Sequence, residues 1–171
     1  MKKMSCFLLL IAISFSWTGM FASARGEEKD QAVLARALQP AKTTLEAGLK
    51  ASEREGKPIS AKFEIEHGKL QLSVYTTKGD GFAEAVLDPA TGAIVKAEKI
   101  TDDDDLKEAK AQSAAMSKAT QSLLTATETA VKANSGFRAV SVVPEMKDGH
   151  PIAEVTLLQG STFKKVTTKL D

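Results

Sequence analysis

Two histidines are the side chains in this sequence best suited to hold a metal ion or to move a proton near neutral pH. His67 is followed by Gly68, and His150 is preceded by Gly149, and both positions lie in segments that predict turns. Neither histidine belongs to a His-Glu-x-x-His helix, the arrangement that binds zinc in metallopeptidases. They could share a metal only if the two turns met in space. We therefore expect exposed turn residues, with no metal and no other cofactor.

Acidic and nucleophilic side chains give no clearer catalytic arrangement. Glu64 and Glu66 share one face of a predicted strand, where we expect solvated carboxylates. The aspartates at 102–105 lack the spaced ligands and central glycine of a calcium loop, and they suit the start of a helix instead. Serine and threonine are abundant, but no base partner is recognisable in the sequence. The sequence therefore predicts no catalytic residues and a protein that is not an enzyme.

The first 24 residues have the pattern of a signal peptide. Two lysines precede an apolar run at 7–17, and the Ala-Ser-Ala sequence at 22–24 offers the small residues at which a signal peptidase cleaves. A retained membrane anchor is the alternative, but the run is short for a membrane span. Cleavage predicts a periplasmic protein that begins at Arg25 and is soluble.

Composition after that cleavage excludes several classes of protein. The 23 basic side chains fall to 21 when Lys2 and Lys3 are removed, against 22 acidic ones, so the net charge becomes −1. A nearly neutral, interspersed charge gives no footprint for nucleic acid. Cys6, the single cysteine, is removed too, which leaves no disulfide or thiolate site. No later apolar stretch is long enough to span a membrane.

The sequence that follows predicts helices and then strands. Helices are expected at 27–38 and 43–55, with a break at Pro40. An apolar stripe with steps of three and four residues predicts one face that packs on a sheet, and it consists of Leu34, Leu38, Ala41, Leu45 and Leu49. Runs with apolar residues at alternate positions predict antiparallel strands in hairpin succession, at 59–66, 70–75, 82–87 and 93–100.

The turn between the last two of these strands reads Asp88-Pro89-Ala90-Thr91-Gly92. Proline presets φ at the first corner, aspartate can accept hydrogen bonds from backbone N–H groups ahead of it, and glycine tolerates positive φ. We therefore assign a structural role, rather than a binding role, to Asp88, Pro89, Thr91 and Gly92.

From Leu106 the pattern recurs in shorter form. Residues 45–51 correspond to 127–133 at an offset of 82, and the first stripe maps onto Met116, Thr120, Leu123, Thr127 and Val131. Strands are expected at 137–143, 151–158 and 162–170, without a fourth. We predict an α+β fold of two tandem helix-plus-antiparallel-sheet units, with the helices packed on one sheet face. The units are 25–100 and 112–171, the second lacking the final turn and strand, and an acidic linker at 101–111 joins them.

The missing strand leaves 162–170 without a partner from its own unit on one side. Either this strand pairs with the first unit, or it is an exposed edge that docks another protein and is kept soluble by its lysines. We expect pairing with the first unit, because such a strand would join the two units and explain why the chain ends at Asp171.

These residues resemble the PepSY domain. Three stretches carry the resemblance: TTLEAGLKAS at 43–52, ISAKFEIEHGKLQLSVYTT at 59–77 and AVLDPATGAIVKAEKI at 85–100. The last is similar to the family's hydrophobic-Asp-x-x-Thr-Gly-hydrophobic ending. The resemblance covers 43–100 well and 125–171 weakly, and the second stretch lacks the Asp-x-x-Thr-Gly turn.

The resemblance implies an exported bacterial module. PepSY domains occur in propeptides of thermolysin-type metallopeptidases, where a chaperone or inhibitory role is proposed, and in stand-alone periplasmic proteins. Tandem copies resemble the fold of beta-lactamase inhibitor protein, and the family has no established catalytic residues. We expect a non-catalytic periplasmic protein that binds, inhibits or moderates an exported enzyme such as a peptidase. The alternative is a small-ligand or metal carrier, or a sensor, of the cell envelope.

Overall fold

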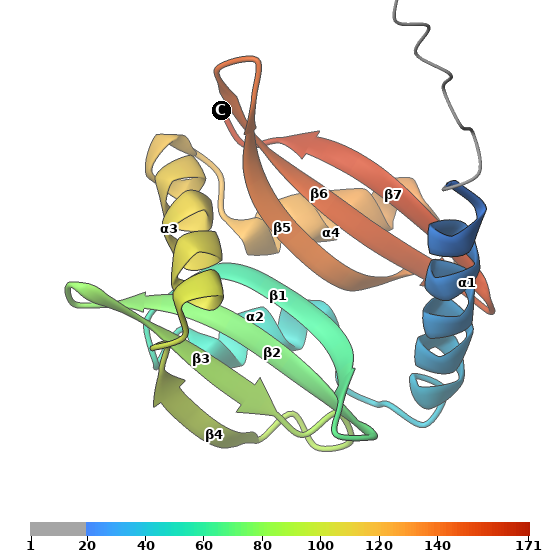
Figure 1. Cartoon of the computed structure of the whole chain (residues 1–171). Helices are drawn as coiled ribbons and strands as arrows, with labels where there is room; N and C mark the ends of the chain where they lie inside the picture. Colours follow the sequence, from blue (N-terminus) through green and yellow to red (C-terminus); the bar gives the residue numbers. More distant parts are fainter. Residues whose placement is uncertain (1–19) are drawn as a thin grey trace, which may run out of the picture.

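The computed structural model describes residues 20–171, and the side chains from Lys29 onward. Within this range the fold is α+β, with four helices and a seven-stranded antiparallel sheet (Figure 1). The elements in chain order are α1 (Met20–Ala37), α2 (Leu45–Ser52), β1 (Lys57–Glu66), β2 (Lys69–Lys78), β3 (Gly81–Leu87), β4 (Ile94–Lys99), α3 (Asp103–Lys118), α4 (Leu123–Ala133), β5 (Arg138–Lys147), β6 (His150–Gln159) and β7 (Thr162–Lys169). Most of the predicted signal peptide, residues 1–19, lies outside the described residues.

The seven strands lie in the order β4-β3-β2-β1-β5-β6-β7. Sequential hairpins form both sides of the sheet, and two residue pairs between β1 and β5, Ala61 with Val142 and Lys62 with Ser141, join them. The expectation that the last strand pairs with the first four is therefore wrong. β1 begins the first run of hairpins and β5 begins the second, so each has one edge without a hairpin partner. These two edges pair with each other, and β4 and β7 become the outer strands.

The helices lie on both faces of this sheet. A Cβ on Gly48 of α2 would lie 2.3 Å from a methyl carbon of Leu72 in β2, whereas Tyr75 in the same strand bonds to α3. Since residues 72 and 75 point to opposite sides of a strand, α2 and α3 cover opposite faces. Figure 1 shows α4 on the α2 side. The expected packing of helices on one face holds for α2 and α4, and is wrong for α3.

The expected break at Pro40 and the expected helix start at the aspartates are both present. α1 ends at Ala37 before Pro40, and α2 begins after Thr44, whose side-chain oxygen accepts a hydrogen bond from the N–H of Ala47 at 3.1 Å. α3 begins at Asp103, and the carboxylate of Asp102 accepts hydrogen bonds from the N–H groups of residues 104 and 105. The aspartates therefore start a helix as expected. That helix fills most of the range 101–111, which we had assigned to a linker.

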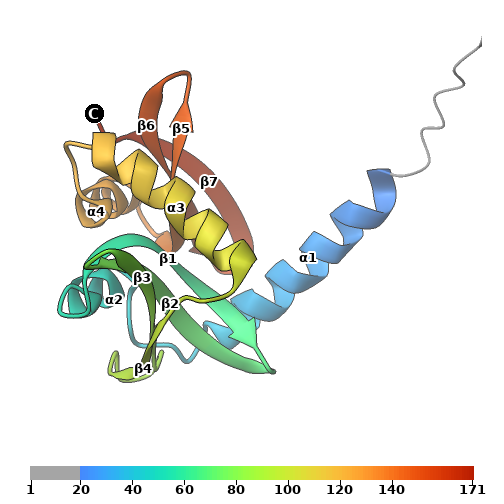
Figure 2. The same ribbon diagram turned by 60° about the vertical axis from the view of Figure 1, so that its left-hand side comes forward.

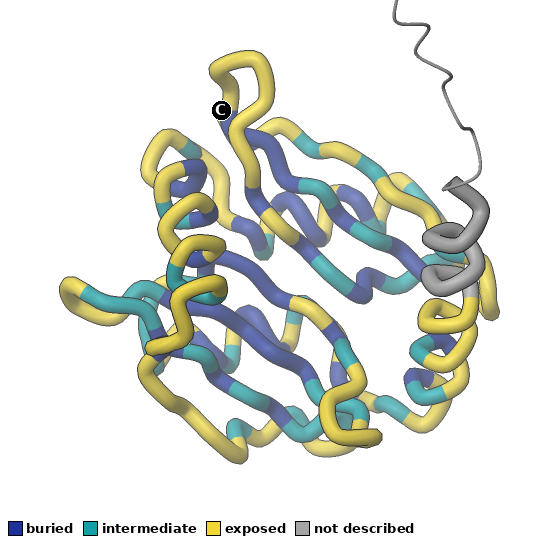
Figure 3. The backbone as a smooth tube through the Cα atoms, in the orientation of Figure 1, coloured by how far each residue is buried: buried dark blue, intermediate teal, exposed yellow. Residues whose placement is uncertain are grey.

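The hydrophobic core follows the sheet and the α2–α4 layer. Figure 3 shows buried stretches along β1, β2, β5 and β6, with exposed turns and outer strands. The predicted stripe contributes Leu38, Leu45 and Leu49, each at most 2% exposed. α1 contacts the core through its C-terminal turns, where Ala35 is buried and Leu34 half-buried (Figure 2). The core is therefore aliphatic, which agrees with the low aromatic content of the sequence.

Side-chain and backbone hydrogen bonds both stabilise the turn at 88–92. Asp88 Oδ1 accepts from the N–H groups of Ala90 and Thr91 at 3.0 and 2.8 Å and from the Thr91 hydroxyl at 2.9 Å, and Gly92 has φ +74°. The Pro89 carbonyl accepts from the N–H groups of residues 42 and 43 at 3.1 and 3.0 Å. The turn thereby fastens the connection between α1 and α2.

Arg138, at the start of β5, reaches the same connection. Its Nη2 donates to the Thr43 carbonyl at 2.8 Å, and its Nη1 lies 3.4 Å from the carbonyls of Leu38 and Ala41. The guanidinium carbon lies 5.5 Å from the ring centroid of Phe63. Burial lowers the pKa of Arg138, but an arginine remains charged throughout the ordinary pH range. One side chain therefore connects β5 to the α1–α2 connection and to β1.

Replacing Gly92 with valine should lower the free energy of unfolding by about 1–3 kcal/mol, because a β-branched residue resists positive φ. A Cβ at this position would also lie 3.3 Å from the Thr43 hydroxyl oxygen. Gly68→Val is a matched control, since Gly68 has φ +76° with no atom within 4 Å of its Cβ position. Urea denaturation should give a loss for both variants and the larger loss for Gly92→Val. Unchanged stability of Gly92→Val would show that the turn does not need glycine.

Replacing Arg138 with methionine keeps much of the apolar stem and removes the donors to three carbonyls. We expect a loss of about 2 kcal/mol in the free energy of unfolding, since hydrogen bonds from charged donors are among the stronger ones. The control is Arg54→Met, because the Arg54 side chain is 66% exposed. Equal urea midpoints for the two variants would contradict a structural role for Arg138.

Candidate functional site

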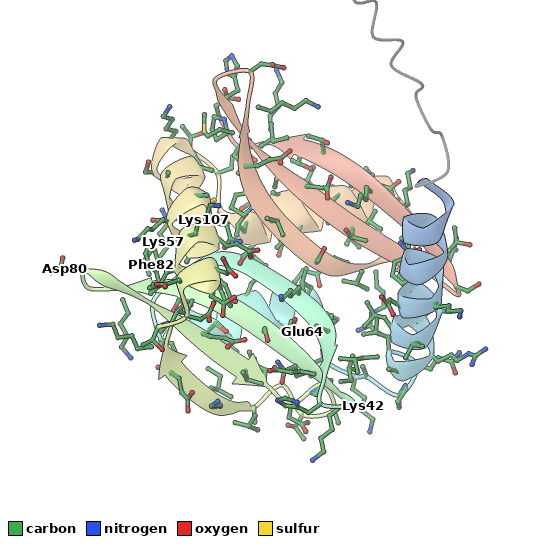
Figure 4. All side chains as sticks on the ribbon, viewed as in Figure 1. Lys42, Lys57, Glu64, Asp80, Phe82 and Lys107 are labelled. Carbon is green, nitrogen blue, oxygen red and sulfur yellow. The ribbon has the colours of Figure 1, made fainter. Side chains whose placement is uncertain are left out.

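A groove lies between α3 and the face of the sheet opposite α2. Its volume is about 310 Å³. Residues from β1, β2, α3 and β5 line it, namely Ser60, Ala61, Lys62, Ser73, Tyr75, Glu108, Ala111, Gln112, Val143 and Pro144. Figure 4 shows Glu64 on the face of the first strands that α3 partly covers. The groove therefore lies where the first four strands meet the last three.

The polar side of α3 faces this groove. Asp105, Glu108 and Gln112 are spaced by three and four residues, which places them on one side of a helix. Tyr75 is 7% exposed, and its hydroxyl donates to Asp105 Oδ1 at 2.9 Å. Burial, followed by the hydrogen bond to Asp105, raises the pKa of Tyr75. The tyrosine therefore stays neutral and holds the first turn of α3 to β2.

Gln112 is the unusual group of the groove. It is 8% exposed, and its Oε1 is buried without a hydrogen-bond partner among the described residues. An unpaired buried acceptor costs about 1–3 kcal/mol, so buried polar groups are normally satisfied. A residue of the groove lining thus carries an acceptor that no donor among the described residues satisfies.

Carboxylates gather on the strand face beside the groove. The Gln71 amide donates to Glu66 Oε2 at 2.6 Å and to Glu64 Oε1 at 3.2 Å, while Lys62 Nζ lies 2.8 Å from Glu64 Oε2. Burial opposes ionisation of Glu64, but hydrogen bonds from Lys62 and its neighbours outweigh burial and lower its pKa. Burial, together with the charges of Glu64 and Glu66, raises the pKa of Glu84. Glu84 is thus the least compensated of these acids.

The two histidines do not come together. β1 and β5 are antiparallel, so the turns that follow them, with His67 and His150, lie at opposite ends of the sheet. His67 lies 3.7 Å from a carboxylate oxygen of Glu66, and His150 Nδ1 lies 2.5 Å from one of Asp171. Among the described residues, no group of three or more His, Cys, Asp and Glu side chains could hold a metal ion. A metal shared by the two turns is therefore ruled out by the topology.

Sequence reasoning placed some of these residues correctly and missed others. Glu64 and Glu66 share a strand face as expected, but Glu64 is half-buried and not fully solvated. Tyr75, Glu84 and Gln112 were not predicted as site residues. The alternation of β2 does place Tyr75 with Gln71 and Ser73, but a local pattern cannot indicate that α3 covers that side.

Replacing Gln112 with methionine, a side chain of similar length, should raise the free energy of unfolding by about 1 kcal/mol, because it removes the unpaired acceptor. Gln31→Met is the control, since Gln31 is exposed on α1. Thermal and urea unfolding of both variants measure the effect. A clear loss of stability in Gln112→Met alone would mean that the amide makes stabilising contacts in the folded protein.

Comparisons with known proteins give little further information. No protein-family model and no curated protein matches this chain. One solved structure, a candidate lipoprotein from Clostridium difficile 630, aligns with 71% of this chain and 80% of its own, at 15% identity and a TM-score of 0.36. No helix within residues 20–171 is long and apolar enough to cross a membrane.

Proposed function

We propose that this chain is an exported, non-catalytic protein of the periplasm with two PepSY-like units, which binds and moderates an exported enzyme such as a peptidase. The Lys-rich start, apolar run and Ala-Ser-Ala sequence support export, and the Asp-Pro-Ala-Thr-Gly turn supports the PepSY-like assignment. Binding without catalysis is supported by the type of groups that the groove contains. They include the unpaired amide oxygen of Gln112 and the carboxylate of Glu108, which suit recognition of a donor.

Equivalent backbone positions support the two units. The hairpin turns after β1 and β5 each contain a residue with φ near +50°, His67 and Asp148, which are 81 positions apart. The Pro89 carbonyl accepts hydrogen bonds from two N–H groups that precede α2. The Leu170 carbonyl, 81 positions after Pro89, accepts hydrogen bonds from two N–H groups that precede α4. The helix caps Thr44 and Ser122 are 78 positions apart, so the offset of 82 that we expected for the helices needs correction by one turn.

The observation that carries the proposed binding is the group of carboxylates on the open strand face. Glu64, Glu66 and Glu84 lie close enough for the charges of the first two to raise the pKa of the third. Basic residues beside them include Lys62, which is paired with Glu64, and Lys69, which lies opposite Glu66 in the β1–β2 register. Lys96 also lies nearby and is paired with Glu98 at 2.8 Å. Perturbed acids of this kind gather at functional surfaces, because a partner of opposite charge relieves the repulsion. A basic surface on the partner would fit this face.

A second candidate function is a carrier of small apolar molecules. A pocket of about 360 Å³ lies between α2, the end of α3 and the start of α4. Apolar side chains make up much of its wall, namely Leu49, Met116, Leu123 and Leu124. Its size falls at the lower end of the range for small-ligand sites. A ligand retained through purification, identified by mass spectrometry, would favour this function.

The test of the binding function compares two charge variants of the same protein. Glu64→Gln, Glu66→Gln and Glu84→Gln together remove the acidic face, whereas Glu53→Gln, Glu128→Gln and Glu145→Gln remove three exposed acids elsewhere. Proteins captured from the host's periplasm are identified, purified and titrated by calorimetry. We expect the first variant to lose at least about tenfold in affinity, as truncated charge pairs do, and the second to bind normally.

Equal affinities of the two variants would refute binding through the strand face. If the unmodified protein captured no exported protein, the binding function itself would be wrong. Cleavage of the captured protein is assayed in parallel, and reduced activity of a peptidase would support moderation of that enzyme.

A further inference from the structure

We infer that the groove under α3 binds an ammonium or guanidinium group carried on a short aliphatic stem. The inference deepens the proposed function, on which it rests for one source of the cation, a lysine or arginine side chain of the protein partner. The other source is a free organic amine or guanidine. Both sources share the same head-group chemistry, which is what the groove would recognise.

Gln112 carries an unpaired acceptor. The residue lines the groove, and its Oε1 is buried and has no donor among the described residues. A cationic N–H donor satisfies such an oxygen more strongly than a neutral one does. An anionic ligand would instead face carboxylates on α3 and on the strands. A donor that entered beside Gln112 would satisfy this oxygen, and a positively charged donor fits best.

Acidic side chains lie along the groove. Glu108 lines it one turn before Gln112, and Asp105 accepts a hydrogen bond from the hydroxyl of Tyr75, another lining residue. Lys62 is the one basic side chain in the lining, and it is paired with Glu64. Burial lowers the pKa of Lys62, yet Glu64, Glu108 and Glu84 together raise it above its usual value. These three carboxylates therefore stabilise the positive charge of Lys62. Because Lys62 is paired with Glu64, a second cation would meet Glu108 and Glu84.

The groove has a small volume and an apolar wall. Val143 of β5 and Ala111 of α3 supply the apolar side chains of that wall. A volume of about 310 Å³ is small for a drug-sized ligand and suits one extended side chain. A stem that packs along Val143 would place its charged head beside Gln112 and Glu108. Long basic side chains bind in this manner, with an apolar stem and a charged end.

The test uses NMR titration of the purified protein with butylguanidinium and butylammonium. Butylurea, which is neutral and nearly the same shape as butylguanidinium, is the control ligand. We expect saturable shifts of the Gln112 side-chain amide and of the backbone amides of Tyr75 and Glu108, with at least about tenfold weaker binding of butylurea. Gln112→Met should weaken cation binding by about tenfold, whereas Gln31→Met should leave it unchanged.

Three results would overturn the inference. They are equal binding of butylurea, shifts confined to residues outside the groove, and unchanged cation affinity in Gln112→Met. These results would leave the proposed function standing if the partner still required the acidic strand face. Conversely, cation binding without any captured partner would support the groove and refute the protein-binding function. Where a partner is found, excess butylguanidinium is added to the complex. Displacement of the partner identifies a side chain of that partner as the source of the cation, and retention of the partner identifies a free amine or guanidine as the source.

Discussion

A single guanidinium joins two parts of the chain that are distant in sequence, and it adds directed hydrogen bonds to the core that the two parts share. The two sides of the sheet share only two residue pairs along β1 and β5, so the strands alone hold them weakly. Arg138 adds contacts to three carbonyls of the α1–α2 connection, and that connection is also bonded to the Pro89 carbonyl. The carbonyls and N–H groups of one irregular segment are thereby satisfied from both sides, as buried backbone groups must be. This arrangement fixes the relative position of the strands that form the groove.

The position of α3 explains why the groove has unusual chemistry. Antiparallel sheets commonly leave one face to water, and the strands from β1 to β4 have the alternation that suits such a face. α3 lies over the margin of that polar face, so it buries Tyr75 and Ser73 and partly desolvates the nearby glutamates. Desolvation is costly for charged groups unless they are paired. The shifted pKa values of the acids and the unpaired amide oxygen therefore follow from the position of α3. This helix covers part of a strand face whose sequence suits exposure to solvent.

The strands could be predicted from the sequence because their signals are local. Alternating residues in β1 and turn residues such as Gly92 determine hairpins whatever the rest of the chain does. The strand order could not be predicted, because the choice between β5 and β7 as the partner of β1 depends on which edge is free after the hairpins form. The candidate site was missed for a similar reason. Gln112 lies on a helix whose packing face is composed mainly of alanine, and small residues give a weak periodic signal.

The sheet order also determines the sequence in which the chain can fold. Every strand neighbour except one is a hairpin partner, so most pairings join residues close together along the chain. The exception joins Ala61 to Val142 and closes a loop that contains β2, β3, β4, α3 and α4. Loop closure of that length costs entropy before its contacts form. The hairpins on each side can therefore form early and locally, and the transition to the native state is completed when β5 and Arg138 reach β1 and its connection.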